Sequence, residues 1–302
     1  MNGSSLYAKL RSSLKRFERS TAIMYSSSLK FRIGFTLITA IVALGLVSLA
    51  TPPYHWQWYK LPKDQPPSLS SIDMILGTTT NGRSVFWASS NAIINSLTIG
   101  LLTALIASHI GLLIGLVAGY KGGLIDRILM LFTDSFVVIP SLPLLIVLSM
   151  LLKEVVNIPL MALMISITSW PWPARQVRAI VISLREREFI STAILTGIPG
   201  WQVIFKEIMP HVLGWHLINA TNTVLYAIGA EIGLSVLGLS ILSMDTLGTM
   251  IYWSTIGYPS LFRGIWWWVL PPIVLTIAIF VSLYLISTAI AERIEPRLRW
   301  RT

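Results

Sequence analysis

Long apolar segments with almost no charge constrain this chain more than any other feature of its sequence. A helix of about 20 apolar residues is long enough to cross the hydrocarbon core of a membrane. Only 12% of the residues are charged, about half of the share found in soluble domains. We therefore expect an all-α polytopic membrane protein with six transmembrane helices. The six segments are 33–50, 91–120, 128–152, 158–173, 212–241 and 266–291.

Two of these segments carry further structural signals. The second contains Gly111, Gly115 and Gly119, spaced by four, and such rows of small residues let helix backbones approach closely in lipid. The third is interrupted by Pro140 and Pro143, so we expect a kinked or two-part helix there. Counting it as two spans would invert the orientation of everything that follows.

The basic residues predict the orientation in the membrane. With a cytoplasmic N-terminus, 18 of the 23 Lys and Arg residues fall in cytoplasmic segments, as the positive-inside rule requires. We expect a protein of the plasma membrane with both termini in the cytoplasm. Its parts are a basic tail at 1–32, a first transmembrane helix at 33–51, an extracytoplasmic loop at 52–90, a core with five helices at 91–291, and a C-terminal tail at 292–302. The basic tail is expected either to lie along the membrane lipid or to be a disordered, solvated segment.

The sequence lacks the residue patterns of an enzyme. It has no cysteine, and its four histidines are scattered without metal-ligand spacing. It has no Ser/His/Asp set and no phosphate-binding G-x-x-x-x-G-K-[ST] run. The net charge of +10 belongs to loops between apolar segments rather than to a soluble domain. We expect a transport protein that binds no nucleic acid, metal or cofactor.

The main interruption of the apolar pattern is the stretch 185–211, which we call the hairpin. Its first part, up to Gly197, has helical spacing, and Gly197 is a typical helix stop. Pro199-Gly200 predicts a turn. A second helix then follows and is expected to end at Pro210. It puts four apolar residues on one face at helical spacing, namely Trp201, Ile204, Phe205 and Ile208.

Several motifs in order along the chain resemble the permeases of ABC importers. In the hairpin, Glu188-Phe189-Ile190, Ala193, Gly197 and Ile208-Met209-Pro210 are similar to the EAA loop of that family. Ser191 and Thr192 stand where the family has glutamate and alanine. Residues 174–179 and 230–239 resemble two further family motifs, and Leu76-Gly77 with Gly82-Arg83 resembles a third. The likeness is to the C-type subunit of dipeptide, oligopeptide and nickel importers.

This resemblance implies a type I importer fold in which the hairpin presents a coupling helix to a cytoplasmic ATPase. It implies a heterodimer with a second permease subunit, two ATPase subunits that hold ATP and Mg, and an extracytoplasmic substrate-binding protein. The loops 52–90 and 242–264 are the expected docking surface for that binding protein. The residues expected to couple to the ATPase are Glu188, Ser191, Thr192, Ala193, Gly197, Trp201, Ile204, Phe205, Ile208 and Pro210. For any one of the four apolar residues of the second helix, packing against the chain's own helix ends is an equal alternative.

Two carboxylates, Asp134 and Glu231, lie inside predicted membrane segments. Buried charge is costly there, so such residues are candidates for function. For Asp134, seven residues after Arg127, the alternative that we favour is a position near the membrane interface or pairing with Ser, Thr or backbone. For Glu231 we favour a structural bond between helices. Peptides are the expected cargo, with oligosaccharides or nickel chelates as alternatives within the same architecture. A proton-coupled carrier using the two acids, and a scaffold or channel without an ATPase, are hypotheses from other classes.

Overall fold

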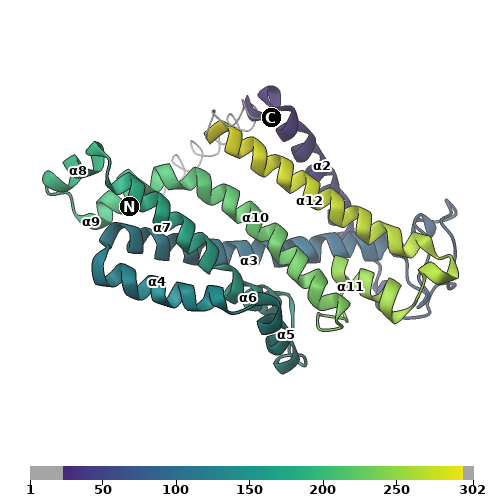
Figure 1. The fold of residues 1–302 in the computed structure, drawn as a ribbon. Helices are drawn as coiled ribbons and strands as arrows, with labels where there is room; N and C mark the ends of the chain where they lie inside the picture. The colour runs from purple at the N-terminus through teal and green to yellow at the C-terminus, as the bar shows by residue number, and fades with distance from the viewer. Residues whose placement is uncertain (1–22, 295–302) are drawn as a thin grey trace, which may run out of the picture.

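The computed structural model describes residues 23–294, and every regular element in that range is a helix (Figure 1). Residues 1–22, most of the expected basic tail, and residues 295–302 lie outside the described range. The helices are α2 (Leu29–Leu46), α3 (Val85–Lys121), α4 (Gly123–Val138), α5 (Ser141–Leu151), α6 (Ile158–Ser169), α7 (Pro171–Arg185), α8 (Glu188–Leu195), α9 (Gly200–Gln202), α10 (Met209–Val236), α11 (Leu247–Tyr252) and α12 (Trp266–Ile294).

Helix α3 is the central element around which the others pack. It is 37 residues long and crosses the molecule from end to end (Figure 1). Its buried residues include Ile93, Ile99 and Leu116. Helices α6, α7 and α10 pack directly on it, and α2 pairs with α12. The hairpin lies at one end of α3, and α11 lies towards the opposite end (Figure 1).

Three helices are long and apolar enough to cross a membrane alone. They are α2 with the 3₁₀ turn that follows it, α3 and α12. Helices α4 and α5 provide a fourth crossing if the bent pair is one span, and α6 is a shorter apolar helix of 12 residues. The described residues therefore confirm an all-helical chain with several membrane-spanning helices. The total of six stays a prediction.

Prolines determine where two of the helices break. Helix α4 ends before Pro140, and α5 leaves it at an angle of 80°, which confirms the two-part third segment. The predicted end of the fourth segment at residue 173 was wrong, because Pro171 begins a new helix that runs on to Arg185. Proline fits the first turn of a helix, where its missing N–H would have no partner in any case.

The glycine row on α3 brings that helix into backbone contact with α7. A Cβ atom on Gly115 would lie 2.6 Å from the carbonyl oxygen of Ala174. A Cβ on Gly111 would lie 2.7 Å from the Trp170 carbonyl oxygen, and one on Gly119 would lie 2.9 Å from that of Arg178. These distances are too short for any side chain. The row is therefore the contact surface between α3 and α7.

We predict that Gly115→Ala destabilises the protein because the new Cβ pushes the α7 backbone away. Overpacking of this kind costs about 1–3 kcal/mol, which would appear as a lower Tm of the protein in detergent. Gly229→Ala on α10 is the matched control, since the nearest atom to its added Cβ is 3.9 Å away. Alanine favours helix there, so that variant should be as stable as the wild type or more so. Equal destabilisation of both variants would contradict the packing role.

Candidate functional site

The hairpin folds from local signals in its own sequence. Helix α8 ends at Leu195, and Gly197 follows with a left-handed φ of +78°. Two backbone bonds close the helix end: the Gly197 N–H donates to Ile194 O, and the Ile198 N–H donates to Ala193 O. The chain then re-enters a helix at Gly200. A left-handed glycine is a common helix terminator because it has no Cβ to clash.

The second arm of the hairpin does not end at Pro210 as predicted. Residues Val203–Ile208 form a π-helical turn, and Pro210 is the second residue of α10, which continues directly from it. Proline is tolerated in the first turn of a helix. The hairpin is therefore joined without a break to α10.

One face of the hairpin is buried against the ends of α3 and α7. Ile190 and Ala193 of α8 and Val203, Ile204 and Ile208 of the second arm all belong to this face. They form a single apolar cluster with residues of α3 and α7, which include Leu112, Leu116, Val177 and Val181. The hairpin is thus seated on the helices and is not a loose loop.

The opposite face exposes large apolar side chains. Trp201 is 61% exposed and Phe205 49%, and the two are one helical turn apart. Leu195, Phe189 and Ile194 are also exposed. Exposed apolar clusters of this kind mark surfaces that bind other molecules. We call Phe189, Ile194, Leu195, Trp201 and Phe205 the exposed face of the hairpin.

The structure thus divides the predicted coupling residues into two groups. Ala193, Ile204 and Ile208 are buried within the chain itself. The other seven are not buried, and in Ser191 and Thr192 the hydroxyl donates back to a carbonyl one turn earlier, Arg187 O and Glu188 O respectively. This exposed group is Glu188, Ser191, Thr192, Gly197, Trp201, Phe205 and Pro210.

The two predicted membrane carboxylates are held by different partners. Asp134 on α4 forms an ion pair with Arg175 on α7, with a distance of 2.7 Å between Oδ1 and Nη2. Glu231 on α10 is fully buried, and its Oε1 accepts three hydroxyl bonds of 2.7 Å from Ser235, Ser240 and Thr246. Asp134 therefore links α4 to α7, and Glu231 links α10 to the start of α11.

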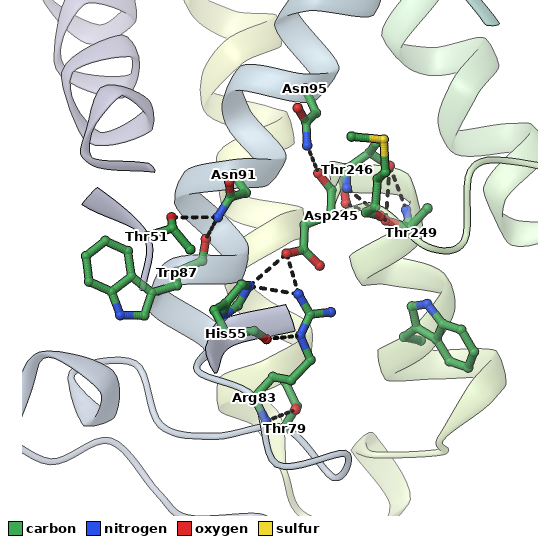
Figure 2. A network of polar contacts seen from close by, with 12 residues as sticks. Thr51, His55, Thr79, Arg83, Trp87, Asn91, Asn95, Asp245, Thr246 and Thr249 are labelled. Carbon is green, nitrogen blue, oxygen red and sulfur yellow. Dashed lines mark hydrogen bonds and ion pairs between the residues drawn. The ribbon is translucent and has the colours of Figure 1, made fainter. Parts of the chain in front are cut away.

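A polar network, drawn in Figure 2, joins the segment after α2 to the α10–α11 connection. Figure 1 shows α11 lying towards the end of α3 opposite the hairpin. The Arg83 guanidinium donates to Asp245 Oδ2 at 2.6 Å and, through Nε, to the backbone carbonyl of His55 at 3.0 Å. His55 Nε2 lies 2.9 Å from the same Asp245 oxygen. Asn95 on α3 donates to the Asp245 backbone carbonyl at 2.7 Å. Three segments far apart in sequence are joined here.

Asp245 is ionised in this network. It lies in the connection between α10 and α11 and is buried. Burial alone would raise the pKa of its carboxyl, but the hydrogen bond from His55 and the positive charge of Arg83 outweigh burial and lower the pKa below its ordinary value. The buried carboxylate of Asp245 is therefore charged at neutral pH.

Sequence reasoning found Arg83 through its motif but missed His55 and Asp245. The available signal was that Asp245 is the single acid in segment 242–264. A lone acid in a loop has many possible partners, so its pairing with Arg83 required the fold. Among the described residues there is no group of three or more His, Cys, Asp or Glu side chains that could hold a metal ion.

Residues 111–300 match the family described as binding-protein-dependent transport system inner membrane components. A match over more than half of the chain, on an all-helical fold with several membrane-spanning helices, defines the class. The protein is a multi-pass membrane permease component and belongs to this family.

Individual relatives make the similarity more specific. The oligopeptide transport system permease protein OppC of Mycobacterium tuberculosis is 32% identical over 228 residues, which cover 74% of this chain and 77% of the relative. The dipeptide transport system permease protein DppC of Bacillus subtilis is 32% identical over 235 residues, 76% of this chain and 70% of the relative. OppC of Bacillus subtilis is 28% identical over 293 residues, 93% and 92% of the two chains.

We predict that Arg83→Met strongly destabilises the protein because it leaves Asp245 as a buried charge without its cation. Removing one member of a buried pair costs about 3–5 kcal/mol, measurable as a loss of Tm in detergent. The matched control is Arg263→Met, which breaks the more exposed ion pair with Asp64 and should cost about 0–1 kcal/mol. Similar losses for the two variants would show that the Arg83 network is not a structural tie.

A second prediction concerns pH. Because the pKa of Asp245 is lowered in the folded protein, its contribution to stability is complete above the ordinary Asp pKa of about 3.9. The contribution is lost as the pH falls through the lowered pKa. The Tm difference between wild type and Asp245→Asn should therefore be constant from pH 7 to about 5 and shrink below about 4. A difference that grows on acidification would contradict the ionised state.

Proposed function

We propose that this chain is one half of the transmembrane pore of an ATP-driven importer of peptides. The observation that carries the proposal is the exposed face of a hairpin whose other face is seated on α3 and α7. A rigid element with an apolar outer face is suited to receive force from a partner and pass it to the helices. We infer peptides as the substrate class because the relatives are named oligopeptide and dipeptide transport system permeases.

In the proposed assembly, six spans of this chain pair with a second permease subunit, and both termini face the cytoplasm. Two ATPase subunits, which hold ATP and Mg, bind below and contact the exposed face of the hairpin. Closure of the ATPase pair then rotates α3 and α7 and exposes the pore alternately to the two sides. An extracytoplasmic binding protein delivers the peptide at the opposite end, where the 52–84 segment and α11 are tied together by Asp245.

The contacts of the two membrane carboxylates support ATP rather than a proton gradient as the energy source. Asp134 is paired with a guanidinium. Glu231 is fully buried among hydroxyl donors. A proton-carrying acid must release its partners in every cycle, and both of these acids are held by partners on another element. Both contacts are suited to holding helices together.

We predict that the double variant Trp201→Asp, Phe205→Asp loses its ATPase subunit on copurification from gently solubilised membranes. The two side chains are exposed, so the substitutions leave the buried face of the hairpin intact. Apolar anchors at the centre of an interface contribute about 2 kcal/mol or more each, and two aspartates in their place should abolish binding. The wild-type chain should retain the ATPase.

The matched control is Phe262→Asp, which makes the same kind of change at a residue that is 94% exposed in the connection between α11 and α12. It should retain the ATPase. Ile208→Asp is unsuitable because Ile208 is buried in the chain's own core. An ATPase that stays bound to the double variant contradicts the coupling role of the exposed face. A wild-type chain that copurifies with no ATPase contradicts the importer proposal itself.

A further inference from the structure

A cavity of about 400 Å³ lies where two helix breaks face the middle of α10. One break is at Pro140, between α4 and α5, and the other is at Pro171, between α6 and α7. Asn222 of α10 lies on the third side. Figure 1 shows α5 leaving the line of α4 beside the α6–α7 junction. Non-helical backbone at membrane depth is tolerated where it is buried in protein or lines a water-filled cavity.

The prolines leave backbone acceptors at the cavity wall. In an α-helix the carbonyl of each residue accepts from the N–H four positions on, and proline has no N–H. Phe136, Ile139 and Ser169 each stand four residues before a proline. All three line the cavity. Their carbonyl oxygens therefore lack the usual helical donor.

Side-chain donors come from α10. Asn219 is only 6% exposed, and its Nδ2 has no hydrogen-bond partner among the described residues. A buried donor without a partner is unfavourable, and this one belongs to a cavity-lining residue. Asn222 and Tyr226, which also line the cavity, add a further amide and a hydroxyl. The cavity thus offers donors on one side and acceptors on the other.

The described residues that line the cavity include no charged side chain. Trp172 and Phe136 add aromatic surface, and the volume is in the range of small-molecule sites. Every peptide unit presents one N–H donor and one C=O acceptor. A neutral wall with both kinds of group can therefore bind the backbone of a peptide without selecting for the charge of its side chains.

We propose that this cavity is a peptide-backbone binding site on the transport route, neutral so that peptides of either charge can pass. The proposal rests on the function proposed above, because it needs a peptide as the cargo. It assigns a binding role to Asn219 and Asn222 and to the carbonyls freed by the prolines. The ligand is a short peptide of any side-chain charge.

The test adds a charge of each sign to the cavity wall. Asn222 is exposed on α10, so Asn222→Asp and Asn222→Lys should fold. The matched control is Asn157→Asp, the same chemical change at the cap of α6, away from the cavity. Aspartate caps a helix as well as asparagine does. Cells carrying the intact transporter, with each variant in place of this chain, are compared for uptake of Ala-Ala-Ala, Ala-Glu-Ala and Ala-Lys-Ala.

We expect Asn222→Asp to lower uptake of Ala-Glu-Ala relative to Ala-Lys-Ala by about tenfold, because like charges repel at short range in a poorly screened site. Asn222→Lys should shift the ratio in the opposite direction, which a folding defect cannot do. Asn157→Asp should keep the wild-type ratio. Unchanged ratios in both Asn222 variants, with wild-type peptide uptake intact, overturn the site and leave the importer standing. A wild-type transporter that moves a neutral oligosaccharide and none of the three peptides overturns both proposals.

Discussion

The close approach of α3 and α7 is the contact on which the other parts of this molecule depend. Because Gly111, Gly115 and Gly119 have no Cβ atoms, the backbones of the two helices pack in direct contact. The hairpin is seated on these two helices, and Arg175 of α7 pairs with Asp134. One of the two proline breaks that border the uncharged cavity is at the start of α7. In lipid, where apolar side chains gain little from meeting one another, such close backbone packing is a main source of helix association.

Much of the architecture could be predicted from the sequence because its signals are local. Apolar runs indicated the helices, Pro140 the bend, and Gly197 the end of the first arm of the hairpin. The two faces of the second arm could not be predicted in the same way. Helical spacing put Trp201, Ile204, Phe205 and Ile208 on one face, but Ile204 and Ile208 are buried while the other two are exposed. The π-helical turn over Val203–Ile208 widens the helix and displaces side chains from their α-helical positions.

Long-range polar pairings were beyond sequence reasoning for a different reason. Asp245 meets partners 162 and 190 residues away, and no periodicity relates such positions. The same holds for the neutral cavity, whose walls come from two separate helix breaks and α10. Prolines marked the breaks, but a single sequence does not tell which breaks face each other. Glu231 was recognised as unusual from its position in an apolar run, yet its three hydroxyl partners became evident only in the fold.

The Arg83–Asp245 network has a consequence for how the far end of the molecule can move. It fastens the segment after α2 to the α10–α11 connection, and Asn95 fastens that connection to α3. A second ion pair, between Arg263 and Asp64, joins the segment after α2 to the α11–α12 connection. These contacts hold the segment after α2, the two connections and this end of α3 together as one rigid body. A tilt of α3 produced at the hairpin would therefore move all of these parts together. The transport pathway would then open at the interface with a neighbouring subunit and not within this chain.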